Sequence, residues 1–287
     1  MLALWHRILS RPVGFHANAD EKSRSLLLDA VRSSSTHIVA HAAFDSMASA
    51  LQGTGSLSRG SIGVAVPISG VCWVEWLGTA AQQVGMLCVV SKVRESGLPE
   101  QAAFAMFACS DGEPYCINGR VGVFDGDGIF LGVSPAPTPF TPKLEVDPNA
   151  DQFMAAVAVT IQAFAFAHCK NVGMAHDPLH GPSEKWCRRQ KIPSVVYRRL
   201  VIPGLTGTRG EPLHGADGEG LRAQIVRGHF KTYTKDSPLF GKYTGKFWHH
   251  AHVRGNPDLG CVVKDYVPVP IDGSKERIDG SEQSLSV

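Results

Sequence analysis

The sequence contains no C-x-x-C pair and no apolar run long enough to cross a membrane. Its most apolar window, from Phe153 to Cys169, falls short of the roughly 20 residues that a transmembrane helix needs. The seven cysteines are odd in number, and several lie in apolar stretches such as VCWVEW and GMLCVV. This usage indicates small buried side chains in a reducing compartment, not a disulfide framework or a zinc knuckle. We therefore expect a cytoplasmic protein that does not bind a membrane.

The sequence also lacks the glycine-rich loops of the common nucleotide-binding and hydrolytic enzymes. There is no Walker loop, no G-x-G-x-x-G after a strand, and no glycine-rich elbow around a serine or cysteine. These absences exclude kinase, NTPase and dehydrogenase interpretations and hydrolases that use a Ser or Cys nucleophile on such an elbow, and no cofactor is predicted. The sequence DGDG at 125–128 lacks the remaining acidic positions of an EF-hand loop. It therefore predicts a hairpin turn and not a calcium site.

The 287 residues are 44% hydrophobic and 19% charged, which is typical of a globular protein. The charge is distributed unevenly along the chain. Residues 1–184 carry 11 Lys and Arg against 16 Asp and Glu, whereas residues 185–264 carry 15 against 5, a net of +10. Such a basic segment indicates a surface for a polyanion, RNA or DNA, although a solvated basic face has the same composition.

Hydrophobic patterning predicts an α+β fold in which an antiparallel β-sheet packs on a long apolar helix. The N-terminal segment, 1–60, is expected to be helical. Asp20 or Asn18 would cap a first helix, and Thr36 would cap a second that runs through THIVAHAAFDSMASAL. Short β-type runs separated by turns then predict an antiparallel β meander over 61–135.

The segment 136–270 is expected to contain the central helix and a basic C-terminal β region. Asp147 as N-cap and Pro148 at the first helical position predict a helix to about Lys170. Its interior is apolar nearly all round, so this helix should be buried. The polar tail, 271–287, is expected to be disordered.

The run CWVEW places an acidic residue inside an apolar strand. A period of two puts Cys72, Val74 and Trp76 on one face of this strand, with Trp73 and Glu75 on the other. Core packing with one exposed face explains the pattern as well as a functional acid does.

The densest group of chemically active side chains lies in two strand-like runs, RGHFKTY at 227–233 and KFWHHAHVR at 246–254. Alternate residues of a strand share a face, so each run places four such side chains on one side. Pairing of the two runs as a hairpin would gather Arg227, His229, Lys231 and Tyr233 with Trp248, His250, His252 and Arg254 on one surface.

This combination of side chains suits RNA. Arg and Lys neutralise phosphates, Tyr and Trp stack on unpaired bases, and His exchanges protons near neutral pH. The candidate catalytic residues are His229, as the proton-transfer residue, and Lys231, which would stabilise charge on the phosphate. The residues expected to bind RNA are Arg227, Tyr233, Lys246, Trp248, His250, His252 and Arg254, together with Arg188 and Arg189 of the basic stretch KWCRRQK.

The histidines are not predicted to hold a metal ion. His250 and His252 would lie on one strand face, where His229 or Cys261 could join them. Zinc sites usually need three or four ligands that include recognisable local pairs, with carboxylates nearby to orient them. No Asp or Glu that could orient them is visible around these residues.

The chain resembles a group of phage- and plasmid-borne proteins whose C-terminal region carries R-G-H followed by an aromatic residue. The features that carry the resemblance are VPISGVCWVEW, an apolar helix ending in CKNV, a Lys/Arg-rich link and RGHFKTYT. The motif falls on Arg227, Gly228, His229, Phe230 and Tyr233. Anti-CRISPR-like relatives tend to have Trp after the motif histidine, where this chain has Phe, and its LFGKYTGKFW is similar to the phage-type branch.

The wider group includes a type V-A anti-CRISPR protein that lowers production of its target nuclease. The mode of action that this resemblance implies is recognition of the nascent nuclease followed by loss of its transcript. The resemblance implies a mobile-element protein that acts in the cytoplasm of a bacterial host. It would bind RNA or a ribosome–nascent-chain complex and deplete a host-defence transcript. Two alternatives stay open: a metal-independent ribonuclease, and a protein-binding inhibitor module that contacts a host-defence protein and no RNA.

Overall fold

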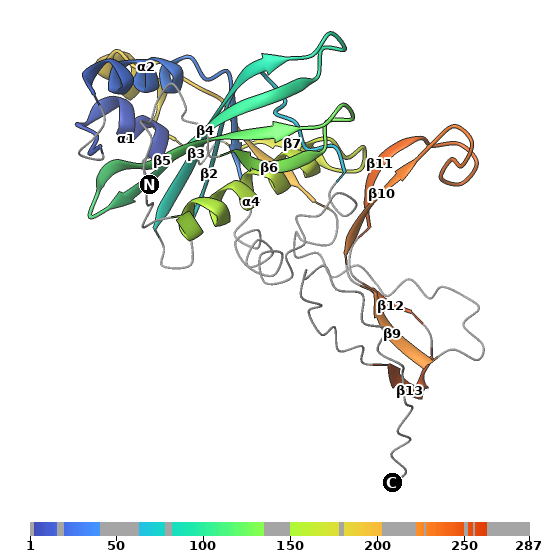
Figure 1. Ribbon diagram of the computed structural model, residues 1–287. Coiled ribbons are helices and arrows are strands. Elements are labelled where there is room, and N and C mark those ends of the chain that lie inside the picture. Colours follow the sequence, from blue (N-terminus) through green and yellow to red (C-terminus); the bar gives the residue numbers. More distant parts are fainter. Residues whose placement is uncertain are drawn as a thin grey trace.

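The protein is a mixed α+β structure (Figure 1). The computed structural model describes residues 3–15, 20–40, 63–77, 82–134, 150–177, 181–202, 222–226, 228–249, 252–254 and 256–262. The helices in these ranges are α1 (Leu4–Ser10), α2 (Glu21–Arg32), α4 (Ala150–Ala167) and α5 (Glu184–Gln190).

Eight strands form one sheet with the order β6-β5-β4-β3-β2-β1-β8-β7. Its strands are β1 (Thr36–Val39), β2 (Val71–Leu77), β3 (Gln83–Val93), β4 (Pro99–Ser110), β5 (Glu113–Phe124), β6 (Phe130–Ser134), β7 (Gly173–His176) and β8 (Tyr197–Val201). Two small sheets follow in the C-terminal region. They contain β10 (His229–Tyr233) with β11 (Gly245–His249), and β12 (His252–Arg254), β9 (Arg222–Val226) and β13 (Asn256–Val262).

Five consecutive strands, β2 to β6, pair antiparallel with their neighbours. The predicted meander is therefore confirmed. The turn at 125–128 is the predicted hairpin turn, because the Asp125 side chain accepts hydrogen bonds from the backbone N–H groups of Asp127 and Ile129, both at 2.9 Å. An Asp side chain that bonds to backbone two residues ahead stabilises such turns.

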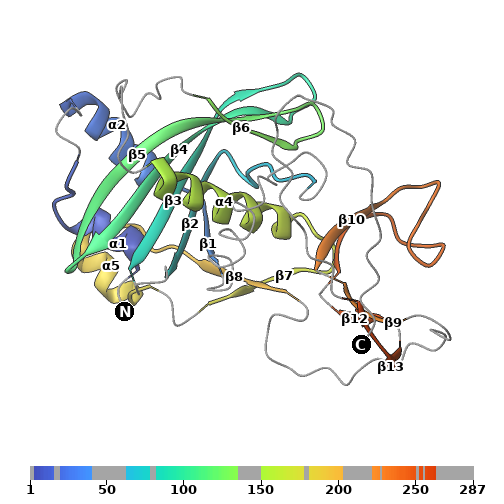
Figure 2. The same cartoon turned by 60° about the horizontal axis from the view of Figure 1, so that its bottom comes forward.

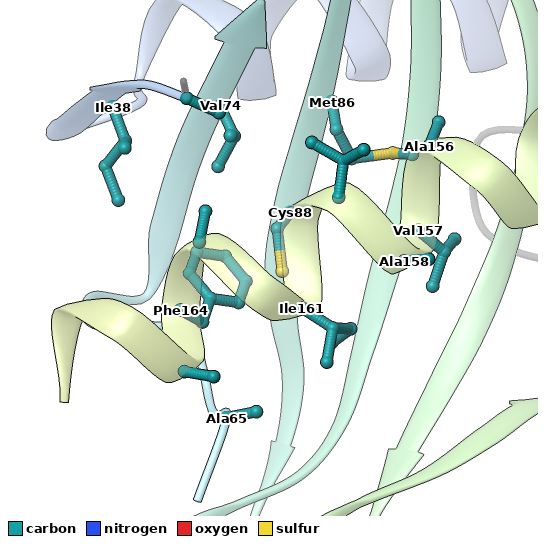
Figure 3. Close-up of a cluster of buried hydrophobic side chains, with 14 of the residues drawn as sticks. Ile38, Ala65, Val74, Met86, Cys88, Ala156, Val157, Ala158, Ile161 and Phe164 are labelled. Carbon is teal, nitrogen blue, oxygen red and sulfur yellow. The ribbon is translucent and has the colours of Figure 1, made fainter. Parts of the chain in front are cut away.

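The two faces of the sheet carry separate layers of helix. Helix α4 crosses one face, and α1 and α2 lie on the other (Figures 1 and 2). The side chains of strand β2 alternate as predicted: Cys72, Val74 and Trp76 pack in the cluster that contains α4, and Trp73 packs with α1 and α2. The face with Trp73 and Glu75 is not exposed, because both side chains are buried under α1 and α2. Figure 3 shows Phe164 of α4 near Val74 of β2. The sheet is therefore buried on both sides at its centre.

Glu75 is a buried structural acceptor, only 2% exposed. Its carboxyl oxygens accept hydrogen bonds from the Trp73 indole N–H at 2.6 Å and from the backbone N–H groups of Leu4 and Trp5 at 3.3 and 3.4 Å. The first N–H groups of a helix have no partner within the helix. Glu75 therefore holds the start of α1 against the sheet.

The helix predicted from Thr36 is wrong at its beginning, because residues 36–39 form β1. This strand pairs in parallel with β2 and with β8, and its burial pattern places His37 and Ile38 inside the protein. Tertiary pairing on both sides outweighs the local helical pattern. The rest of that predicted helix, from residue 41, lies outside the described residues.

The first predicted helix is confirmed as α2. The Asp20 side chain accepts a hydrogen bond from the Ser23 backbone N–H at 2.7 Å, as an N-cap does. Helix α1 lies within the segment 1–60 that was expected to be helical, although no separate helix was placed there, and α5 was not predicted. Ser183 caps α5 in the same way by accepting from the Trp186 N–H, and Lys191 ends it in the left-handed conformation.

The predicted segments contribute to a common structure. The large sheet takes strands from 1–60, 61–135 and 136–270. The predicted start of the central helix at Asp147 and Pro148, and the predicted tail, 271–287, lie outside the described residues.

We expect Glu75→Leu to lower the free energy of unfolding by roughly 3 kcal/mol, because it leaves one indole and two backbone N–H groups without their acceptor. Urea denaturation measures the loss. The matched control is Glu95→Leu at an exposed turn, which should change stability by no more than about 0.5 kcal/mol. Equal effects of the two substitutions would show that Glu75 does not anchor α1.

Candidate nucleic-acid interface

Strands β10 and β11 form the antiparallel hairpin that the sequence predicts. Their register pairs His229 with His249, Lys231 with Phe247 and Tyr233 with Gly245. Directly paired residues share a face. His229, Lys231, Tyr233, Phe247 and His249 therefore lie on one side of the hairpin, and we call this set the hairpin face.

The side chains of the hairpin face contact one another. The imidazole rings of His229 and His249 are stacked, with centroids 5.3 Å apart and an interplanar angle of 13°. The Tyr233 hydroxyl lies 3.2 Å from Nε2 of His249, and Lys231 Nζ lies 4.9 Å from the centre of the Tyr233 ring. His229 and Lys231 are exposed. Two imidazoles, an ammonium and a phenol thus meet on one solvent-facing surface.

The opposite side of the hairpin packs on the end of α4. The rings of Phe230 and Trp248 each lie 4.9 Å from that of Phe166, and 4.9 Å from each other. Asn171 holds β11 in place: its side-chain N–H donates to the Trp248 carbonyl at 2.7 Å, and its side-chain oxygen accepts from the Trp248 N–H at 2.9 Å. The hairpin is therefore fastened from behind by apolar packing and a paired hydrogen bond.

Two predicted RNA-binding residues lie on this packed side, which corrects the predicted common surface. Trp248 is only 8% exposed and Lys246 only 6%. The prediction grouped Trp248 with Lys231, which requires a register one residue away from the observed one, and a shift of one residue moves every side chain to the other face. Phe247 and His249 take the places that the prediction gave to Trp248 and His250.

Lys246 is held inside the protein. Its ammonium donates a hydrogen bond to the Val64 carbonyl at 2.7 Å and lies 4.4 Å from the centre of the Phe230 ring. Burial lowers the pKa of Lys246 from 10.5 to about 8. This side chain therefore ties the hairpin to the segment before β2 and does not face a ligand.

The other predicted RNA-binding residues are not brought to the hairpin face by the described structure. Arg227 and His250 lie outside the described residues, and His252 and Arg254 belong to β12, which pairs with β9 in a separate sheet. Arg188 and Arg189 are exposed on α5, at the opposite end of the molecule from β10 (Figure 2). The basic segment thus supplies more than one surface.

A second polar cluster lies inside the core on the α1 side of the sheet. The His6 ring contacts Cys187 Sγ through Nε2 at 3.6 Å and the Tyr197 hydroxyl through Nδ1 at 3.1 Å. All three side chains are buried, and burial raises the pKa of the Cys187 thiol and of Tyr197. A thiol that is buried and protonated is a poor nucleophile, so this contact is structural.

Five further cysteines are also buried and free, as predicted: Cys72, Cys88, Cys109, Cys116 and Cys169. Burial raises the pKa of Cys116 to about 12 and that of Cys169 to about 11. Within the described ranges, no three His, Cys, Asp or Glu side chains are close enough together to hold a metal ion. No helix in the same ranges has the length and apolar character needed to cross a membrane.

Comparison with known proteins adds no relative to this geometry. No protein-family model, no curated protein and no solved structure matches the chain.

Stability should depend on pH through Lys246. Because its pKa is about 8 in the folded protein and 10.5 in its ordinary state, the unfolded chain binds more protons between these values. The free energy of unfolding of the wild type should therefore rise by up to about 2 kcal/mol between pH 7.5 and 9.5, relative to Lys246→Met. Urea denaturation of both proteins at the two pH values measures the difference. A constant difference would contradict a buried ammonium.

Proposed function

We propose that this protein is an anti-CRISPR-like regulator of phage or plasmid origin that binds RNA through the hairpin face in the cytoplasm of a bacterial host. The observation that carries the proposal is the two-sided hairpin: Lys231 and His229 are exposed on one side, and Phe230 and Trp248 anchor the other. RNA engaged there would belong to a host-defence transcript or to a ribosome–nascent-chain complex, and binding would deplete that transcript.

The hairpin face has the chemistry that single-stranded RNA requires. Lysine neutralises phosphate, and aromatic rings stack on unpaired bases whatever the sequence. Lys231 lies against the Tyr233 ring, so a phosphate and the base next to it would meet both groups together. Packing behind the hairpin limits how far these side chains move, which lowers the entropy lost on binding. These features favour RNA over an apolar protein surface.

The R-G-H-aromatic resemblance has a physical explanation in this hairpin. His229 faces outward, whereas the aromatic Phe230 packs against Phe166 and Trp248. A Trp at position 230, as in anti-CRISPR-like relatives, would provide an apolar ring at the same half-buried place. The motif thus combines a residue for recognition with a residue for anchoring, which supports a shared use of the hairpin.

A second candidate function is a metal-independent ribonuclease, which the contact between His229 and His249 favours. Cleavage of RNA without a metal needs a base for the ribose 2′-hydroxyl, an acid for the leaving oxygen and a cation for the phosphate. The two imidazoles, with Lys231 beside Tyr233, supply these three groups within a small area. Tyr233, bonded to His249, would orient that imidazole.

RNA affinity should fall when the hairpin face is removed. We expect Lys231→Ala combined with Tyr233→Ala to weaken binding of a single-stranded RNA by about 10-fold or more, because one phosphate contact and one stacking ring are lost. The control is Arg188→Ala combined with Arg189→Ala, which removes two charges at the far end of the molecule. Fluorescence anisotropy at several salt concentrations measures both. Equal losses would indicate diffuse electrostatic binding and contradict a defined hairpin site.

The ribonuclease candidate has its own test. We expect wild-type protein to cleave single-stranded RNA in excess EDTA with a bell-shaped pH profile, and expect His229→Ala and His249→Ala each to abolish cleavage. Gel analysis of end-labelled RNA measures the products. If the protein binds the RNA but leaves it intact, the ribonuclease hypothesis is wrong and the RNA-binding function stands. A nuclease-insensitive complex with a host protein, without RNA affinity, would favour the inhibitor module instead.

A further inference from the structure

The tip of the β10–β11 hairpin presents a large apolar side chain to solvent. Phe240 is 88% exposed, the highest value among the large hydrophobic side chains whose exposure the structure describes. Its neighbours close the turn tightly: Leu239 and Tyr243 exchange backbone hydrogen bonds at 2.7 and 3.0 Å, and the Lys242 N–H donates to the Leu239 carbonyl at 3.1 Å. The ring therefore stands on an ordered turn.

The backbone at this turn is unfavourable for phenylalanine. Phe240 has φ 52° and Gly241 has φ 68°, so two successive residues lie in the left-handed region. Hairpin turns of this kind prefer Asn-Gly, because a bulky side chain in the left-handed region costs about 1–2 kcal/mol. Because the ring is exposed to water, it also gains none of the stabilisation that burial of a phenylalanine provides. Unfavourable conformations of this kind cluster at functional sites.

The hairpin carries the ring away from the body of the protein. In Figures 1 and 2 the loop between β10 and β11 projects beyond the sheet and beyond α4. The base of the hairpin is fixed by Asn171 and by the ring of Phe166. The β10–β11 hairpin is therefore a projecting element with a fixed base, an ordered turn and an aromatic side chain at its tip.

The charge around the tip favours a polyanion as the occupant. Lys235 and Lys242 are exposed in the loop, with Asp236 as the acidic residue beside them. Lys242 Nζ lies 5.3 Å from the centre of the Tyr243 ring, which is itself 49% exposed. The loop thus repeats the lysine-on-tyrosine arrangement of Lys231 and Tyr233.

We propose that Phe240 stacks on an unpaired base of the bound RNA, so that the ligand is RNA with accessible bases, as in a loop or a single strand, and not a continuous duplex. This inference rests on the proposed function. In A-form duplexes the bases are stacked and the major groove is too narrow for side chains, whereas unpaired bases stack readily on aromatic rings. A projecting phenylalanine can stack directly on an unpaired base, but it reaches the stacked bases of a duplex poorly.

The test uses the full chain and two variants of the tip. Phe240→Asn removes the ring and keeps a residue that tolerates positive φ, whereas Phe240→Trp keeps an aromatic face. The probe is an RNA hairpin with 2-aminopurine in its loop, compared with the same sequence annealed into a full duplex. We expect wild type and Phe240→Trp to quench the loop fluorescence. Phe240→Asn should bind the loop about 10-fold more weakly, with a Tm equal to or above that of the wild type.

The possible results distinguish a failure of the stacking role of Phe240 from a failure of RNA binding by the hairpin face. If wild type binds the loop through Lys231 and Tyr233 and Phe240→Asn binds equally well, the stacking role is wrong and the hairpin face stands. If wild type shows no RNA binding that depends on the hairpin face, the proposed function is wrong. If Phe240→Asn instead loses a nuclease-insensitive protein complex while RNA affinity is unchanged, the tip is a protein contact and the inference is overturned.

Discussion

The packing of α4 is the constraint on which the rest of the structure depends. An 18-residue helix that is apolar on nearly every side must be covered on every side, and the sheet covers only one of them. Near its C-terminal end the helix contacts the hairpin through Phe166, and the chain that follows holds β11 through Asn171. Burial of the apolar surface of α4 therefore both forms the core and positions the hairpin.

This arrangement gives the hairpin two functions on two faces. Because side chains alternate along a strand, each outward residue is adjacent to an inward one. Phe230 and Trp248 satisfy the need to bury apolar area, which leaves His229, Lys231 and Tyr233 to face solvent on a fixed support. Preorganised side chains lose less entropy on binding than mobile ones. A surface of this kind suits recognition of a flexible strand.

Buried polar groups fix elements that apolar packing alone would leave free to shift. Glu75 binds the first N–H groups of α1, and Lys246 binds the Val64 carbonyl ahead of β2. Each group is costly to bury, and each is compensated only when its partner is in place. The two contacts therefore select one placement of α1 and one placement of the hairpin, at opposite ends of the sheet.

Local patterns in the sequence were enough to predict the start of α2 with Asp20 as one of two cap candidates, the turn at Asp125, the alternation of side chains along β2 and the pairing of β10 with β11. Each depends on periodicity or on contacts a few residues apart. Only the tertiary structure decided that Thr36 begins a strand, because β1 needs β2 and β8 beside it. It also decided that His249, and not Trp248, joins His229, because register follows from which rings pack on α4. Contacts between distant segments cannot be recognised in the local sequence pattern. Alternation therefore defines the two faces of a strand, but only packing in the folded core decides which face is buried.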